Sequence, residues 1–251
     1  MISRSSDMIV LDTPILKLQS IISSKEPIIL RELLTKNEAK TIRDHAWLQT
    51  KLNKMITLPD IFLNCPNFHS INNNVEKSQV KKILHYYAFF YWNDESRSVD
   101  VYFRRMFKLR NLLSDLPEYY GLSNDDGYIS MPVVQQYPRG GGYMQEHTDP
   151  TFRQKVVVNT ILSTFGKDYN DGGLFFRNKN NEKIYVDSLL NPGDAFLFHP
   201  EISHGVDPID LNSKLDWSKE DGRWMCFSTL VTLSSLQGVK DGTAGNVTTS
   251  Y

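Results

Sequence analysis

The chain has little cysteine and no long apolar run. Cys65 and Cys226 are its only cysteines among 251 residues. They are too few for a disulfide framework or a cysteine-based zinc site, so both are expected to be small buried hydrophobic residues. The short apolar run near the N-terminus is interrupted by Asp12, and no other apolar stretch reaches membrane-spanning length. We therefore expect no membrane partner and a cytoplasmic location.

An excess of positive charge is absent as well. The chain has 28 Lys and Arg against 29 Asp and Glu, which gives a formal net charge of −1. The basic residues are scattered, whereas nucleic-acid-binding proteins concentrate them in a patch. Nucleic acid is thus not expected as a partner. Hydrophobic residues at 40% and charged residues at 23% are ordinary for globular proteins and indicate a packed core.

The N-terminal part of the chain has mainly helical patterns. Residues 26–34 resemble an apolar strand, and Thr35 follows as a helix N-cap with Glu38 three positions later, the spacing of a capping box. Between residues 75 and 116 apolar residues recur at helical spacing, with a break near residues 92–95. This pattern predicts one helix after Thr35 and two more between residues 75 and 116.

After Pro117 the sequence changes to short β-branched and aromatic runs separated by Gly, Pro, Asn and Asp clusters, which is typical of antiparallel strands and turns. We expect a two-sheet jelly roll or barrel over residues 128–237, backed by the helical part, residues 1–127, in a single domain. Residues 238–251 are expected to form a flexible tail. The predicted strands cover residues 129–137, 145–149, 155–163, 173–177, 183–189, 194–199 and 223–233, and the polar residues 207–222 are expected to form an insertion loop.

Two histidines and one aspartate are candidate metal ligands. His147 and Asp149 are two positions apart in a predicted strand, so their side chains face the same side. A His-x-Asp triplet alone arises easily by chance and more often binds nothing. His204 follows a later apolar strand, in a predicted short loop, and competes with His199 for the role of the second histidine. Two imidazoles and a carboxylate form the facial triad that binds iron(II) and leaves positions open for substrate and oxygen.

Arg223 opens the last predicted strand. It alternates with Met225 and Phe227, so it is expected to point with them into the barrel, where a guanidinium needs an anionic partner. A carboxylate bound in a bidentate manner would satisfy it. Asn159 and Thr229 have the same inward phase and are available to hydrogen-bond either a bound molecule or a buried backbone group.

The order of these motifs resembles the iron(II)/2-oxoglutarate dioxygenases, particularly their prolyl-4-hydroxylase-like branch. The resemblance covers about residues 129–233. Three features depart from it: the gap from Tyr143 to His147 is longer, the basic residue is Arg where this branch commonly has Lys, and the polar insertion lengthens the gap before it. The matching residues are Tyr137, Gly140 to Gly142, Tyr143, His147-x-Asp149, the strand VVVNTILS, Asp171-Gly172-Gly173-x-Phe175-Phe176, Pro192-Gly193-Asp194-Ala195, His204 and Arg223.

The resemblance implies a double-stranded β-helix (jelly roll) as the core of an α+β, mainly β protein, with N-terminal helices packed on one sheet. It implies that His147, Asp149 and His204 bind iron(II), that Arg223 binds the distal carboxylate of 2-oxoglutarate, and that Tyr137 adds a hydroxyl contact. Molecular oxygen is the implied second co-substrate, with ascorbate as a stimulant. Relatives that halogenate have a small residue where this chain has Asp149, so the carboxylate favours hydroxylation.

The prime substrate is not encoded in any motif. We expect a small metabolite such as a free amino acid, enclosed by the N-terminal helices and the loop 207–222, and a monomer or homodimer. Hydroxylation of a prolyl or other residue in a protein is an alternative, as is a metal-binding jelly roll without catalysis. Arg104, Arg105 and Arg139 are candidates for a substrate carboxylate, although helical arginines are more often at the surface.

Overall fold

The computed structural model describes residues 2–5, 8–11, 14–52, 61–74, 80–151 and 153–232. Within them, one antiparallel sheet has the strand order β10-β9-β12-β7-β5-β6-β13-β8-β11-β3, and β4 pairs with β5 beside this path. A separate hairpin joins β1 (Ile2–Ser5) and β2 (Met8–Leu11). The strands of the large sheet are β3 (Ile28–Leu30), β4 (Phe68–Asn73), β5 (Lys82–Ala88), β6 (Ile129–Pro138), β7 (Gly142–His147), β8 (Val157–Ile161), β9 (Gly173–Arg177), β10 (Lys183–Tyr185), β11 (Ala195–Phe198), β12 (His204–Ile209) and β13 (Gly222–Val231).

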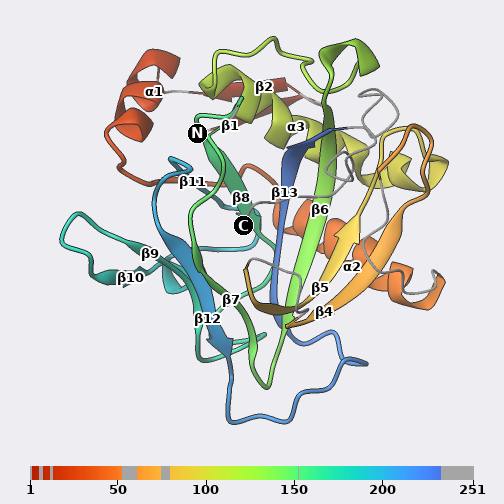
Figure 1. Ribbon diagram of the computed structural model, residues 1–251, viewed down its shortest axis with the longest axis vertical. Helices are drawn as coiled ribbons and strands as arrows, with labels where there is room; N and C mark the ends of the chain where they lie inside the picture. Colours follow the sequence, from red (N-terminus) through yellow and green to blue (C-terminus); the bar gives the residue numbers. More distant parts are fainter. Residues whose placement is uncertain are drawn as a thin grey trace.

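This sheet curls into a half-barrel, which confirms the predicted mainly β jelly-roll core (Figure 1). β13 alternates between two hydrophobic clusters, as a strand with both faces buried must. Met225 and Phe227 belong to the cluster inside the curl. Trp224 and Cys226 belong to a second cluster on the outer face, beneath the helices. The inner face is therefore available to form a site, while the outer face anchors the helical layer.

Three α-helices accompany the sheet in the described residues: α1 (Ile15–Ser23), α2 (Lys36–Leu52) and α3 (Arg97–Leu113). α2 and α3 bury Ala39, Ile42, Phe103 and Met106 in the outer cluster, so helices cover one face of the sheet as expected. The capping box at the start of α2 is present. Thr35 N–H donates to Glu38 Oε2 at 2.8 Å, and Glu38 N–H donates to Thr35 Oγ1 at 3.1 Å, an arrangement that contributes about 1 kcal/mol.

The prediction of two helices between residues 75 and 116 is half wrong. Only α3 is helical; the first half contains β5, and residues 75–79 lie outside the described part of the chain. β5 is flanked by other strands on both sides, and both its faces are covered, so nearly all its residues are buried. A strand buried on both faces loses the alternation that would identify it in a sequence.

The sequence analysis also did not predict β4, β12, α1 or the hairpin β1–β2. His204, expected in a loop, is the first residue of β12. The polar connection between β12 and β13 is shorter than predicted and spans residues 210–221, extending beyond one end of the sheet (Figure 1). Cys65 and Cys226 are buried, as predicted. No helix in the described ranges is both long and apolar enough to cross a membrane. The predicted tail, residues 238–251, lies outside those ranges.

Candidate metal centre

The two candidate histidines occupy the ends of neighbouring strands. β7 ends at His147 and β12 begins at His204, and the antiparallel register pairs these two residues directly. Their ring centroids are 4.4 Å apart. Gly205 allows this close approach, since a Cβ there would lie 2.9 Å from the carbonyl oxygen of Met144 and from the ring of Phe175. The sheet itself thus brings two imidazoles from distant parts of the sequence together.

Asp149 completes the cluster from the segment after β7. Its backbone N–H donates to the carbonyl of Pro200 at 2.9 Å, which holds the segment beside the turn that leads into β12. Asp149 Oδ1 lies 3.7 Å from His147 Nε2, and Oδ2 lies 3.5 Å from His204 Nε2. One ligand atom from each of the three residues falls within 4.8 Å of the others. The predicted His-Asp-His cluster is therefore present.

Backbone carbonyls orient both imidazole rings. His147 Nδ1 lies 2.8 Å from the carbonyl oxygen of Gln145, and His204 Nδ1 lies 2.9 Å from that of Ile202. A carbonyl only accepts, so each Nδ1 carries the hydrogen and each Nε2 keeps its lone pair. Both Nε2 atoms face Asp149. Metal-binding histidines are held in this way.

The electrostatics of the cluster suit a cation. Burial lowers the pKa of His147 and of His204 to about 4, and the neighbouring His204 contributes further to the shift at His147. Burial raises the pKa of Asp149 to about 6, although the nearby His147 opposes the shift. Asp149 Oδ1 is buried and accepts no hydrogen bond from the described residues. A buried carboxylate oxygen with no donor needs explanation, and a divalent cation between two neutral imidazoles and this carboxylate provides one.

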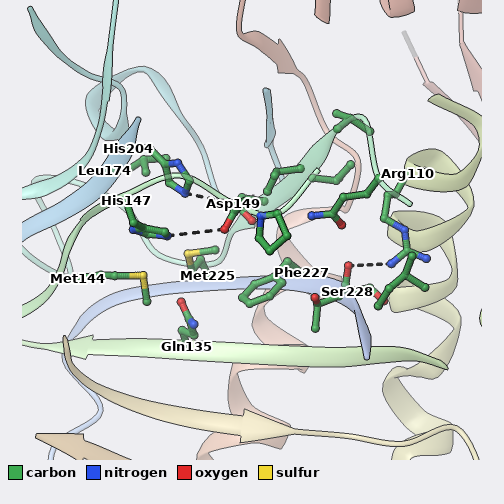
Figure 2. Close-up of a pocket in the computed structure, with 18 of the residues that line it drawn as sticks. Arg110, Gln135, Met144, His147, Asp149, Leu174, His204, Met225, Phe227 and Ser228 are labelled. Carbon is green, nitrogen blue, oxygen red and sulfur yellow. Dashed lines mark hydrogen bonds and ion pairs between the residues drawn. The ribbon is translucent and has the colours of Figure 1, made fainter. Parts of the chain in front are cut away.

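The cluster opens onto a cavity of about 130 Å³ inside the curled sheet (Figure 2). Tyr137, Asn159 and Thr229, all predicted co-substrate contacts, line this cavity. The Tyr137 hydroxyl donates to Gln135 Oε1 at 2.6 Å. The structure thus brings these three residues to the same space as the metal cluster, and their contacts with a co-substrate stay predictions. None of the loop residues 207–222 is among the residues that line this cavity, and the expectation that this loop encloses the substrate stays a prediction.

Arg223 is buried, as predicted, but its anionic partner belongs to the protein. Its Nε and Nη2 donate to the Asp187 carboxylate at 2.7 and 3.0 Å. Asp187 also accepts from the Tyr169 hydroxyl at 2.7 Å and from the Leu174 N–H at 2.9 Å. Arg223 therefore does not by itself require an external dicarboxylate, which corrects the reasoning from strand phase. Its Nη1 is buried and donates to no described residue, but Arg223 is not among the residues that line the cavity.

The remaining candidates lie away from the cluster. His199 is in the turn before β12, where its Nδ1 accepts from the Glu201 N–H at 3.2 Å. Each candidate arginine for a substrate carboxylate is paired with an acid outside the cavity: Arg104 with Asp100, Arg105 with Glu38 and Arg139 with Asp210.

Arg110, which the sequence reasoning missed, lines the cavity. A signal for it exists in the sequence. Arg110 shares helical spacing with Phe103, Met106 and Leu113, so it places a charge within the apolar stripe of α3. Such a position is more often filled by an apolar residue.

Comparisons with known proteins give structural neighbours only. No family model matches the sequence, and no curated protein matches it. A Pseudomonas putida prolyl-4-hydroxylase is similar in structure, with a TM-score of 0.57 and 12% identity over 86% of this chain and 98% of the other. A non-heme alpha-ketoglutarate-dependent epimerase from nogalamycin biosynthesis gives a TM-score of 0.54, with 11% identity over 92% and 91% of the two chains.

A prolyl hydroxylase from Trichoplax adhaerens, solved with a hypoxia-inducible-factor peptide fragment, is a third neighbour. It has a TM-score of 0.50 and 14% identity, covering 90% of this chain and 94% of the other. At these identities the likeness shows the fold alone, which the chain shares with these two prolyl hydroxylases and this alpha-ketoglutarate-dependent epimerase. The predicted resemblance is confirmed at that level.

Proposed function

We propose that the protein is an iron(II)- and 2-oxoglutarate-dependent dioxygenase that hydroxylates an unactivated C–H bond of a small metabolite. One observation carries the proposal: His147, Asp149 and His204 converge beside a cavity, with both Nε2 lone pairs and a buried, unsatisfied carboxylate oxygen directed together. The fold shared with oxygenases supports it.

Iron(II) and 2-oxoglutarate, when bound, supply the oxygen activation that such a hydroxylation needs, with release of succinate and carbon dioxide. The protein's own task is to hold these groups and exclude water. The side chains of His147, Asp149 and His204 are only 6–7% exposed, so a bound cation is shielded from solvent. Three protein ligands leave positions open, and a metal site that keeps open positions is catalytic rather than structural in character.

Arg223 is proposed to bind the distal carboxylate of 2-oxoglutarate through Nη1. Asp187 fixes the other edge of the guanidinium, and the Arg223 Cζ lies 5.5 Å from the centroid of the cavity-lining Tyr137 ring. Asp187 then acts as a positioning residue, because it holds the guanidinium in one orientation. Because the Asp187 carboxylate offsets the charge of the guanidinium, 2-oxoglutarate binding through this arginine is expected to be weaker than through an unpaired one.

Anaerobic titration with iron(II) and then 2-oxoglutarate tests the proposal. The chelate has a weak visible charge-transfer band, expected in the wild type, absent in His204→Ala, and requiring more 2-oxoglutarate in Arg223→Gln. His199→Ala is the matched control, since His199 lies in the turn before His204 but outside the cluster, and it should keep the band. A folded wild type with no band would overturn the proposal and favour a metal-binding scaffold without catalysis.

A protein substrate is the second candidate function. It is favoured by one neighbour, which was solved with a peptide fragment bound. Against it stands the burial of the metal cluster, since a residue within a polypeptide needs an open approach. Succinate formation with free amino acids in one series and proline-containing peptides in another would separate the two substrates.

A further inference from the structure

Arg110 is a buried arginine with no acidic partner. Its exposed fraction is 1%. Nη2 donates to Ser130 Oγ at 2.7 Å and Nη1 donates to the Ser228 carbonyl at 3.1 Å, which connects α3 to β6 and β13. Nε and Nη2 also donate to Asn111 Oδ1, at 3.2 and 2.8 Å. All these acceptors are neutral, so the guanidinium has hydrogen bonds but no counterion among the described residues.

Other buried arginines of the chain differ in this respect. Arg223 is paired with Asp187, and Arg105, one and a half turns before Arg110 on the same helix, is paired with Glu38 at 2.9 Å. A buried charge without an opposite charge is costly. Burial lowers the pKa of Arg110 to about 9, and no carboxylate offsets this shift. The fold thus keeps the Arg110 guanidinium in its interior without an acidic partner among the described residues.

This cation borders the same cavity as the metal cluster. Figure 2 shows Arg110 and Ser228 at one end and His147 and His204 at the other, with Phe227 between them. The Ser228 hydroxyl is buried and has no hydrogen-bond partner in the described part of the chain. One end of the cavity therefore offers an unneutralised guanidinium and an unused hydroxyl, which are the groups that bind a carboxylate.

We propose that Arg110 binds the carboxylate of the prime substrate, which is therefore a small carboxylic acid, with free amino acids as the first candidates. The assignment rests on the proposed function and narrows it. With the substrate carboxylate at Arg110, the rest of the molecule extends along the cavity toward His147, Asp149 and His204. An internal prolyl residue of a protein has no carboxylate to place there. The distal carboxylate of 2-oxoglutarate has the same chemistry, so the experiment must separate the two.

The test compares Arg110→Gln with Arg105→Gln in manganese(II)-loaded protein, so that binding is read without turnover. One arm measures 2-oxoglutarate affinity by calorimetry. The other measures thermal stabilisation by free amino acids and by their amides, with 2-oxoglutarate saturating. Arg105→Gln is the matched control. Arg105 is also a buried arginine of α3, but its guanidinium pairs with Glu38 and does not line the cavity.

The expected result has three parts. At least one amino acid stabilises the wild type while its amide does not. Arg110→Gln binds this amino acid roughly 10- to 100-fold more weakly than the wild type does. The affinity of Arg110→Gln for 2-oxoglutarate equals that of the wild type. Arg105→Gln keeps the amino acid response but loses stability without ligand. The proposal is overturned if Arg110→Gln weakens 2-oxoglutarate itself, or if no amino acid distinguishes Arg110→Gln from the wild type. Failure of manganese or 2-oxoglutarate to bind the wild type would instead refute the proposed function.

Discussion

Two pairs of neighbouring histidines lie on paired strands of the same sheet, and only one is arranged for a metal. The rings of His147 and His204, on β7 and β12, have centroids 4.4 Å apart. Those of His69 and His85, on β4 and β5, are 5.0 Å apart and nearly parallel. Proximity is therefore similar in the two pairs.

The difference lies in what the ring nitrogens meet. His69 Nε2 and His85 Nδ1 share a hydrogen bond of 2.8 Å, and the His69 ring stacks on Tyr87. In the other pair each Nδ1 is held by a backbone carbonyl, and Nε2 is turned toward a carboxylate. The direction of the lone pair and the presence of an acid, more than the distance between two histidines, mark a metal site.

The largest expected effect comes from removing that acid. Asp149→Asn keeps the size of the side chain but removes its charge, so divalent metal affinity should fall by roughly 100-fold or more. The metal-free variant should be at least as stable as the wild type, because a buried carboxylate with an unsatisfied oxygen is lost. Calorimetry with manganese(II) and thermal unfolding without metal measure the two effects. Unchanged metal affinity would contradict the assignment of Asp149.

Breaking the His69–His85 pair should lower the stability of the fold and leave metal binding unchanged. His85→Phe removes the hydrogen bond and leaves His69 Nε2 buried without that partner, which is expected to cost about 1–3 kcal/mol in the free energy of unfolding. Urea denaturation measures it. His69→Phe/His85→Phe removes both polar groups and should recover part of the loss. A fall in manganese(II) affinity in a folded His85→Phe protein would show that the two pairs are coupled.

The metal cluster was predictable because local motifs supplied its candidates and the resemblance to a known family selected His204 over His199. His147 and Asp149 are two positions apart, and His204 follows a strand with its own pattern, so only the pairing of two strands had to be assumed. The register of β7 with β12 supplies that pairing. The strand phase of Asn159 and Thr229 likewise places them at the cavity, and Tyr137, which the resemblance implied, lines it as well.

What sequence reasoning missed depends on tertiary packing. β5 gives no strand signal because neighbours cover both of its faces. The partner of Arg223 is an aspartate 36 positions earlier, in a short 3-10 turn, and no local pattern connects the two. Arg110 belongs to a helix, where an arginine is usually exposed, and only the packing of α3 on β6 and β13 brings it to the cavity.

Acidic pH should weaken the fold through the His69–His85 pair. Burial lowers the pKa of His69 to about 4 and that of His85 to about 3. The unfolded chain, with histidine pKa values near 6.5, takes up these protons first, so this contribution is fully present above about pH 6.5 and is lost progressively as the pH falls from there to about 4 and 3. The slope is at most about 1.4 kcal/mol per pH unit for each histidine. Urea denaturation at pH 7, 6 and 5 should show a smaller slope in His69→Phe/His85→Phe. Equal slopes would mean that this pair titrates normally.

The smallest expected effect is at Glu146, which lies outside the cavity and connects the two strands that carry His147 and His204. Its carboxylate accepts from Arg177 at 2.9 and 2.8 Å and from the Ser203 hydroxyl at 2.7 Å, so it connects the residues that precede His147 and His204. Hydrogen bonds from Arg177 lower its pKa to about 2 despite partial burial.

Because the Glu146 carboxylate is partly exposed, Glu146→Gln should cost less than about 1 kcal/mol in the free energy of unfolding. Metal affinity should weaken by only a few-fold, since the backbone carbonyls still orient both rings. Glu201→Gln, at an exposed acid paired with Lys25, is the control. A loss of metal affinity as large as that of Asp149→Asn would mean that Glu146, and not the backbone, positions the two imidazoles.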